Sequence, residues 1–276
     1  MLKNYKLLVD KDCPMCNIYS NAFHKMGLLH KDCITSFQIE SATNNLDIDY
    51  QRAKDEIAFH NTISGKTTYG LKALILIITQ GTGLAFRLMQ NKLIYNPLLA
   101  LYKLISYNRK VIYPTSAKES SMVCNPSFNI NYRWTYIIIV AILTGLIVNQ
   151  FTDILFTHLG WRHNLIVEMV ICFGQIAWQS VAIGLLRKEK RLEYLGNMST
   201  VSMIGALLMI PFLVIFEYWQ PSLTMTLLIF FSIIGTMFLE HIRRCKLLEI
   251  PLSMTASWVA YRTVALALLI LIMAYL

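Results

Sequence analysis

Residues 5–16 read YKLLVDKDCPMC, and this stretch decides what the first half of the chain can be. The apolar run Tyr5–Val9 predicts a short strand that ends at Asp10. Pro14 is suited to the first turn of a helix. Apolar residues recur at helical spacing after it: Ile18, Ala22, Met26 and Leu29. The segment Cys13-Pro14-Met15-Cys16 therefore lies where a strand is followed by a helix.

That position favours thiol chemistry. The first N–H groups of a helix are unpaired and carry partial positive charge, so they stabilise a thiolate at Cys13. Cys16 lies one helical turn further on, near enough to attack a mixed disulfide formed at Cys13. We therefore expect Cys13 to be the nucleophile of a redox-active pair and Cys16 to be its resolving thiol. Lys11 would favour the thiolate, and Asp12 would oppose it.

Further elements of an α/β domain follow the motif. The segment Ile34–Ile39 alternates as a second strand, and Ser64-Gly65 indicates a hairpin between two strands. Two helices are expected after the hairpin. The expected ranges are Glu56–Thr62 and Lys66–Tyr69 for the hairpin strands, and Leu71–Thr79 and Pro97–Tyr107 for the helices. This order predicts a thioredoxin-like domain over residues 1–114 and a linker over residues 115–133.

Residues 134–276 predict an all-α transmembrane helical bundle. The whole chain of 276 residues is 55% hydrophobic and 15% charged, with a mean hydropathy of +0.49, which is too apolar for an ordinary soluble protein. Most of five apolar stretches reach the roughly 20 residues that cross about 30 Å of hydrocarbon. The expected spans are about 134–156, 164–186, 199–219, 223–239 and 255–276.

The breaks between the spans predict an orientation. Residues 187–191 and 243–246 hold seven basic residues, whereas the other two breaks hold only Arg162. Because basic loops stay cytoplasmic, the N-terminal domain is expected in the cytoplasm and the C-terminus outside. The start of the sequence lacks a signal-peptide pattern, which agrees with this orientation. The expected location is a bacterial cytoplasmic membrane, with the N-terminal domain on the cytoplasmic side. In such a reducing compartment, a close pair of cysteines is more often catalytic or metal-binding than structural.

Charge helps to exclude one class of partner. Before Trp134 the chain has 16 Lys and Arg against nine Asp and Glu. These basic residues do not form a helix interleaved with aromatic side chains, so nucleic acid is not an expected partner. The excess positive charge instead favours contact with anionic headgroups of the lipid bilayer.

The motif and two later segments resemble a known family. Asp10-Lys11-Asp12-Cys13-Pro14-Met15-Cys16 resembles the Asp-x-x-Cys-x-x-Cys signature of the DCC family of predicted thiol–disulfide oxidoreductases. Gly65–Gly70 followed by Ala73-Leu74, and then Tyr95–Arg109, resemble later parts of that family, so the likeness covers about residues 5–114. It implies a thioredoxin-like fold, protein thiols and disulfides as partners, and Asp10, Cys13 and Cys16 as site residues.

The chain also departs from the family pattern. Lys11 stands where the family usually has Gly, and Val9 where an aromatic residue is common. The absence of proline between Met15 and Lys92 means that the cis-proline loop of thioredoxin is missing, so substrate recognition must differ. Asp10 has two open roles: it could take the proton of one thiol, or it could accept hydrogen bonds from N–H groups at the helix start.

Two other functions remain open. Cys13, Cys16, His30 and Cys33 have a spacing that could bind zinc, although no cofactor is expected beyond the redox-active cysteine pair. The chain could also be a non-enzymatic transporter or assembly factor whose CxxC domain senses redox state or binds zinc. A quinone bound by the membrane half is a further alternative to the absence of a cofactor.

The second span carries a stripe of polar residues: Glu168, Cys172, Gln175 and Gln179. Ionisable groups inside a membrane are costly and usually face the interior of a bundle. With Asp153 and Glu217 at the same level, Glu168 could form an outward-facing acidic pocket; alternatively, these groups hydrogen-bond the helices together. Arg262 in the last span is expected to reach the cytoplasmic surface or to pair with Glu240.

Overall fold

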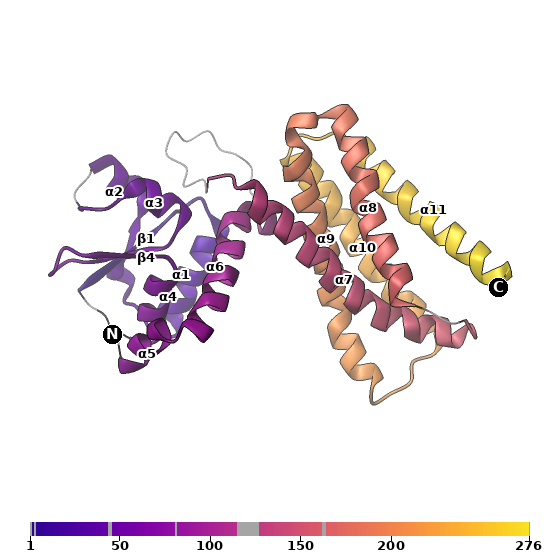
Figure 1. The fold of residues 1–276 in the computed structure, drawn as a ribbon, viewed down its shortest axis with the longest axis horizontal. Coiled ribbons are helices and arrows are strands. Elements are labelled where there is room, and N and C mark those ends of the chain that lie inside the picture. The colour runs from indigo at the N-terminus through magenta and orange to yellow at the C-terminus, as the bar shows by residue number, and fades with distance from the viewer. Residues whose placement is uncertain are drawn as a thin grey trace. The chain divides into compact units, whose positions relative to one another are not determined.

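The computed structural model describes residues 2, 4–43, 46–80, 82–114, 127–161 and 164–275. The chain divides into two compact units, Met1–Tyr132 and Arg133–Leu276 (Figure 1). The first unit contains a small mixed sheet with helices, and the second is entirely helical in its described part.

The described part of the first unit has a four-stranded sheet in the order β2-β1-β3-β4. Its strands are β1 (Tyr5–Val9), β2 (Ile34–Ser36), β3 (Ala58–Asn61) and β4 (Thr67–Tyr69). Strand β1 runs parallel to β2 and antiparallel to β3, and β3 runs antiparallel to β4. Leu7 in β1 pairs with Ile34 on one side and with Phe59 on the other. The expected hairpin is therefore confirmed.

The helices of this unit cover both faces of the sheet. They are α1 (Pro14–Lys25), α2 (Phe37–Thr43), α3 (Tyr50–Asp55), α4 (Gly70–Ile78), α5 (Gly83–Gln90) and α6 (Lys92–Ile112), with a 3-10 turn, η1 (Lys31–Cys33). Because side chains alternate along a strand, Leu7 packs with α1 and α4, whereas Leu8 packs with α2 and α3. Figure 1 shows α2 and α3 above the sheet and α1 and α4 below it. Helices α5 and α6 pack on α4.

Three details of the first unit correct the sequence-based expectations. Strand β2 ends at Ser36 and a helix begins at Phe37, so the second expected strand is too long. Helix α1 ends at Lys25, and it buries Cys16, Ser20 and Phe23 while Ile18 is 59% exposed. The face of α1 that carries Cys16 packs against the sheet. Contacts with the sheet therefore decide which face of α1 is buried, and the helical spacing of Ile18, Ala22 and Met26 does not. Helix α6 extends beyond the expected range at both ends.

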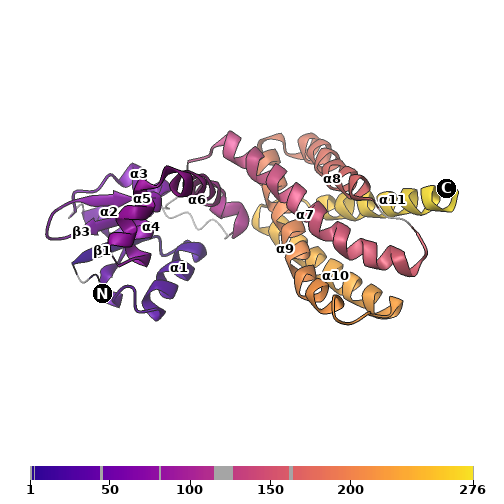
Figure 2. The same cartoon turned by 60° about the horizontal axis from the view of Figure 1, so that its bottom comes forward.

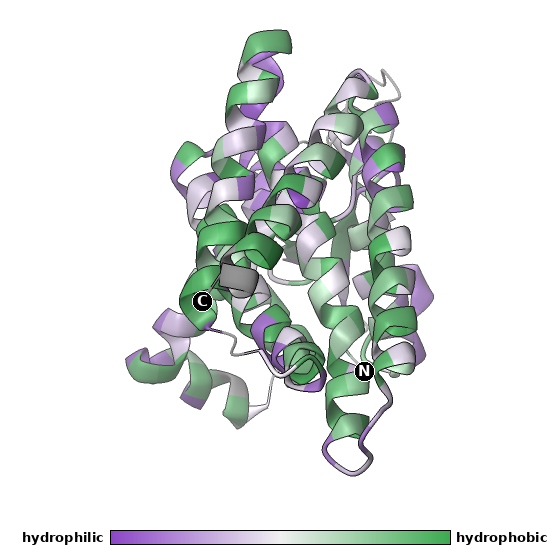
Figure 3. Cartoon of the chain, turned by 90° about the vertical axis from the view of Figure 1, so that its right-hand side faces the viewer, coloured by the Kyte–Doolittle hydropathy of each residue, from purple (hydrophilic) through white to green (hydrophobic). Residues whose placement is uncertain are grey.

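The second unit contains five helices, among the described residues, that are long and apolar enough to cross a membrane (Figure 2). Its helices are α7 (Ile130–His158), α8 (Leu165–Leu186), α9 (Arg191–Phe216), α10 (Leu223–Leu247) and α11 (Ser253–Tyr275), with a 3-10 turn, η2 (Lys188–Lys190). Many of their large apolar side chains are exposed, for example those of Val170, Leu228 and Phe231. Figure 3 shows that hydrophobic residues predominate along these helices. This pattern suits contact with lipid tails.

The helices are longer than the apolar stretches that predicted them. Helix α9 begins at Arg191 rather than near residue 199, and α10 continues to Leu247 rather than ending near residue 239. Helix α7 begins at Ile130, inside the expected linker, of which residues 115–126 lie outside the described residues. Hydropathy marks the segment that suits hydrocarbon, whereas backbone hydrogen bonding continues into the polar turns at either end.

A buried polar network links four helices of the second unit. The hydroxyl of Tyr194 in α9 donates a hydrogen bond to Oε1 of Gln179 in α8, at 2.8 Å, and lies 3.1 Å from Nε2 of His241 in α10. Nδ1 of His241 lies 3.0 Å from the hydroxyl of Thr255 in α11. The imidazole also stacks on Trp258, with 5.5 Å between ring centroids. For Gln179, the helix-linking alternative thus holds.

Candidate functional site

The two cysteines lie at the start of α1, directly after β1. The N–H of Cys13 donates to the carbonyl oxygen of Asp10 at 3.2 Å, and the N–H of Asn17 donates to the carbonyl oxygen of Cys13 at 3.1 Å. Cys13 has an extended backbone at the helix N-cap, and Pro14 occupies the first turn. The expected placement between strand and helix is therefore found.

The two thiols differ in exposure and in acidity. Both are free in the structure; Cys13 is partly exposed, whereas Cys16 is buried. Hydrogen bonding by the thiol of Cys16 lowers the pKa of Cys13 to about 6, against the opposing effect of burial. The backbone N–H of Cys16 and the positive charge of Arg109 lower it further. The same hydrogen bond, together with burial, raises the pKa of Cys16 well above its usual value.

Asp10 is buried beside the cysteine loop and holds it in place. One oxygen of its carboxylate accepts hydrogen bonds from the N–H of Asp12 at 3.0 Å and from the side-chain amide of Gln38 at 2.5 Å. Gln38 in turn accepts a hydrogen bond from Ser36 at 3.0 Å. The negative charge of Asp10 opposes ionisation and so raises the pKa of Cys13, although weakly compared with Cys16. These contacts make Asp10 an acceptor in the loop, and its catalytic role stays a prediction.

Three residues of this site are not in the set predicted from the sequence: Tyr19, Gln38 and Arg109. Arg109 comes from the last turn of α6, and its Nη2 donates to the carbonyl oxygen of Lys54 at 2.5 Å. Tyr19 lies one turn further along α1, and hydrogen bonding by its hydroxyl lowers the pKa of Cys16. Burial, and then the negative charge of an ionised Cys16, raise the pKa of Tyr19. Arg109 and Asp10, rather than Lys11 and Asp12, supply the charges that act most strongly on Cys13.

The i, i+3 spacing of Cys16 and Tyr19 is a signal that could have pointed to Tyr19. For Arg109 the signal is its place in the last segment of the family resemblance. No local pattern between Cys13 and Gln38 indicates that the side-chain amide of Gln38 hydrogen-bonds Asp10 in the cysteine loop.

The zinc alternative requires ligands that the fold does not bring together. No group of three or more His, Cys, Asp or Glu able to hold a metal ion occurs among the described residues. The thiol of Cys33 donates to the carbonyl oxygen of Leu2 at 3.4 Å, and His30 pairs with the exposed Asp32 at 2.9 Å.

The polar residues of the membrane unit also differ from expectation. Glu168 is buried and accepts a hydrogen bond from Thr152 at 3.0 Å, whereas Asp153 and Glu217 are exposed and do not join it in a pocket. Glu240 pairs with Arg243 at 2.6 Å and with Arg244 at 2.7 Å. No ion pair between Glu240 and Arg262 occurs in the described part of the chain.

Comparisons with family models, with curated proteins and with solved structures find no match for this chain. Its function must therefore be inferred from its own residues and their geometry.

Proposed function

We propose that the chain is a membrane-anchored thiol–disulfide oxidoreductase whose substrates are protein disulfides. The observation that carries the proposal is the acidity of one thiol of the pair. With a pKa of about 6, Cys13 is mostly thiolate at neutral pH, whereas an ordinary cysteine is mostly thiol. The thiolate is the reactive form in disulfide exchange, and the partly exposed Cys13 is accessible to a substrate.

The reaction follows from the asymmetry of the two thiols. The thiolate of Cys13 attacks one sulfur of a substrate disulfide, so that a mixed disulfide forms and the other substrate sulfur leaves as a thiolate. The charge on Cys13 is then gone, and Cys16 loses the main influence that keeps it protonated. Cys16 transfers its proton, for which Asp10 is the proposed acceptor, and attacks Cys13. The second substrate thiolate leaves, and two electrons have passed to the substrate.

The pair must then be reduced before it can act again. A dithiol or a low-molecular-weight thiol is the class of reductant that can open the Cys13–Cys16 disulfide by the same exchange reaction. The full cycle therefore takes electrons from a thiol reductant and passes them to a protein disulfide.

The arrangement of the first unit supports a thioredoxin-like fold. In that fold a CxxC motif lies at the junction of a strand and a helix within a βαβ unit. Here the motif follows β1, α1 leads on to the parallel strand β2, and the antiparallel pair β3 and β4 completes the sheet. Helices on both faces support the same proposal.

The positions of basic residues support a cytoplasmic site. Arg187, Lys188 and Lys190 lie between α8 and α9, Arg191 is the first residue of α9, and a second basic group lies at the end of α10. Positive residues at the ends of spans favour the cytoplasmic side. We therefore infer that the N-terminal unit works at the cytoplasmic face, anchored by the five helices.

The test uses the full chain in lipid nanodiscs, with dithiothreitol as reductant and a peptide disulfide with a fluorescent reporter as substrate. Cys13→Ser should abolish turnover, and Cys16→Ser should accumulate a mixed disulfide that mass spectrometry detects. Cys33→Ser is the matched control, because Cys33 is a buried thiol of the same unit that lies outside the pair. Turnover that survives in folded Cys13→Ser, or stoichiometric zinc bound by the cysteine pair, would contradict the proposal.

A further inference from the structure

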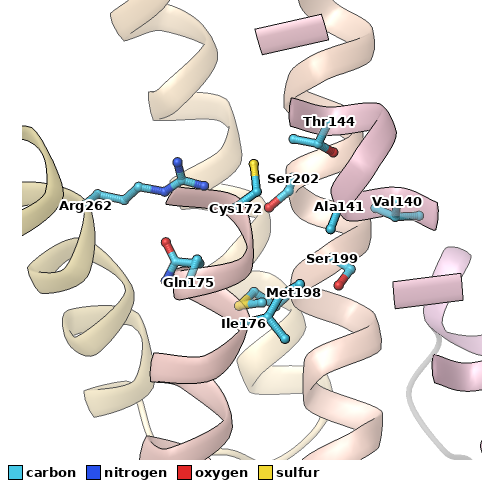
Figure 4. A pocket seen from close by; sticks show the side chains of 10 residues that line it. All are labelled: Val140, Ala141, Thr144, Cys172, Gln175, Ile176, Met198, Ser199, Ser202 and Arg262. Atoms are coloured by element: carbon cyan, nitrogen blue, oxygen red, sulfur yellow. The ribbon is translucent and has the colours of Figure 1, made fainter. Parts of the chain in front are cut away.

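A small cavity with both polar and apolar lining residues lies among four helices of the membrane unit. Its polar lining comes from α7, α8, α9 and α11: Thr144, Cys172, Gln175, Ser199, Ser202 and Arg262. Figure 4 shows Arg262 and Gln175 on the side of α8 that faces α11, with the guanidinium of Arg262 directed toward Cys172, and Thr144, Ser199 and Ser202 on the other side of α8. None of these residues belongs to the cysteine site of the first unit.

Three of these side chains are buried without a hydrogen-bond partner among the described residues. They are Gln175, whose amide nitrogen and oxygen both lack a partner, and Thr144 and Ser199, whose hydroxyls lack one. Their exposed fractions are 2%, 4% and 3%. Burying polar groups without partners is costly, and native proteins rarely leave several of them together. The cluster therefore points to a bound polar species.

The cavity lies near the middle of the spans. Thr144 is the central residue of α7 (Ile130–His158), and Gln175 is at the centre of α8 (Leu165–Leu186). Ser202 and Arg262 lie close to the centres of α9 and α11. At this depth the hydrocarbon offers no water to unpaired groups, so an intramembrane charge indicates a functional site.

The charge of the lining favours an anion. Among the described residues that line the cavity, Arg262 is the only charged one, and none is a carboxylate. The guanidinium of Arg262 lies 5.8 Å from the centroid of the Trp258 ring, and Arg262 forms no ion pair among the described residues. The amide, hydroxyl and guanidinium groups together offer many donors, and a cation would be repelled by Arg262.

The size of the cavity restricts the ligand further. The space open to the centres of water-sized molecules is about 20 Å³, which is room for one water or for an ion of one to a few atoms. A quinone ring needs a much larger space. We propose that this cavity binds a small monovalent anion, of the size of a halide or formate, attracted by the charge of Arg262 and hydrogen-bonded by polar groups of the lining, among them Gln175 and Thr144.

Binding of bromide is the direct test. Full-length protein in detergent is titrated with sodium bromide against sodium gluconate at constant ionic strength, and the thermal unfolding midpoint is recorded. Bromide should raise the midpoint, because a ligand that binds only the folded state stabilises it. Crystals soaked in bromide should show an anomalous peak within hydrogen-bonding distance of Gln175 and Arg262.

Variants assign the effect to the cavity. Arg262→Gln should weaken bromide binding at least about 100-fold, and Thr144→Val about tenfold, because hydrogen bonds to charged groups are strong. Thr263→Val is the control: Thr263 is exposed and bonds the carbonyl oxygen of Val259 in its own helix, so binding should not change. If Arg262→Gln does not fold, Arg262→Lys keeps the charge and should bind within about tenfold of the natural protein.

Two outcomes would overturn the proposal. One is a midpoint that responds equally to bromide and gluconate, which would leave water as the occupant of the cavity. The other is bromide binding of equal strength in the natural protein, Thr144→Val and the folded Arg262 variants. Neither outcome bears on the cysteine site, so the two proposals stand or fall separately.

Discussion

Hydrogen bonding between the thiols of Cys13 and Cys16 has the largest effect on the acidity of both: it lowers the pKa of Cys13 to about 6 and raises the pKa of Cys16, and the backbone N–H donor of Cys16 lowers the pKa of Cys13 further. Both groups of Cys16 come from the first turn of α1, three residues after Cys13. At neutral pH the buried Cys16 therefore keeps its proton, and the accessible Cys13 carries the negative charge. Such a division is what a nucleophile and a resolving thiol require, since only one of them has to meet the substrate.

Removing the thiol donor should make Cys13 less acidic. In Cys16→Ala the pKa of Cys13 should rise from about 6 toward that of a free thiol, because the largest stabilising contact is lost. Alkylation by iodoacetamide at pH 6 should slow about tenfold, even though a more basic thiolate is intrinsically more nucleophilic. Mass spectrometry across a pH series measures this rate. Cys16→Ser keeps a donor and should fall between the two; coinciding profiles for all three proteins would refute the assignment.

Replacing Asp10 with Asn separates its two roles. The substitution removes a negative charge that raises the pKa of Cys13, so the pKa should fall and alkylation at pH 5 should become faster. The side-chain oxygen of Asn can still accept from Asp12 and Gln38, so the loop should hold. If Asp10 accepts the proton of Cys16, turnover should nevertheless drop about 100-fold.

Asp12→Asn is the control for that experiment, because Asp12 is an exposed carboxylate in the same loop. Its turnover should stay close to that of the natural protein. If Asp10→Asn keeps full turnover as well, Asp10 serves only as a hydrogen-bond acceptor in the loop.

Arg109, although far from the motif in the sequence, should lower the pKa of Cys13. Arg109→Gln removes a positive charge that lowers the pKa of Cys13, so the pKa should rise, but by less than in Cys16→Ala. Alkylation at pH 6 should slow about two- to threefold, as expected for one nearby charge. Arg109→Lys keeps the charge and should restore the rate. An unchanged rate in Arg109→Gln would mean that solvent screens this charge completely.

Close packing in the membrane unit can be tested at two glycines of α8. A Cβ at Gly174 would overlap the hydroxyl of Tyr261, which donates to the carbonyl oxygen of Ile171 at 2.9 Å. Gly174→Ala should therefore destabilise the fold by about 1–3 kcal/mol, the usual cost of overpacking. The thermal unfolding midpoint in detergent measures the change.

Gly184 is the matched position, since nothing lies within 4 Å of a Cβ placed there. Gly184→Ala should leave the midpoint unchanged or raise it slightly, because alanine is the better helix former. Equal midpoints for the two variants would show that α8 and α11 do not pack as described.

Local patterns in the sequence were enough for several parts of this protein. The run Tyr5–Val9 followed by Pro14 places a strand and a helix around the cysteines, and both are found where expected. Five apolar stretches predict five spans, and Ser64-Gly65 predicts the hairpin. Each of these depends on neighbours along the chain: on backbone preferences, on periodicity, or on the length of hydrocarbon to be crossed.

Other features depend on residues that are far apart in the sequence, and only the folded chain decides them. The buried face of α1 is chosen by the sheet that it meets, and so Ile18 points outward although its spacing suggested the core. Gln38 contacts the cysteine loop from α2, and the charge of Arg109 acts on Cys13 from α6. Gln175, which has no hydrogen-bond partner among the described residues, lines the same cavity as Arg262 of another helix. Periodicity says which residues share one face of an element, but packing determines what that face contacts.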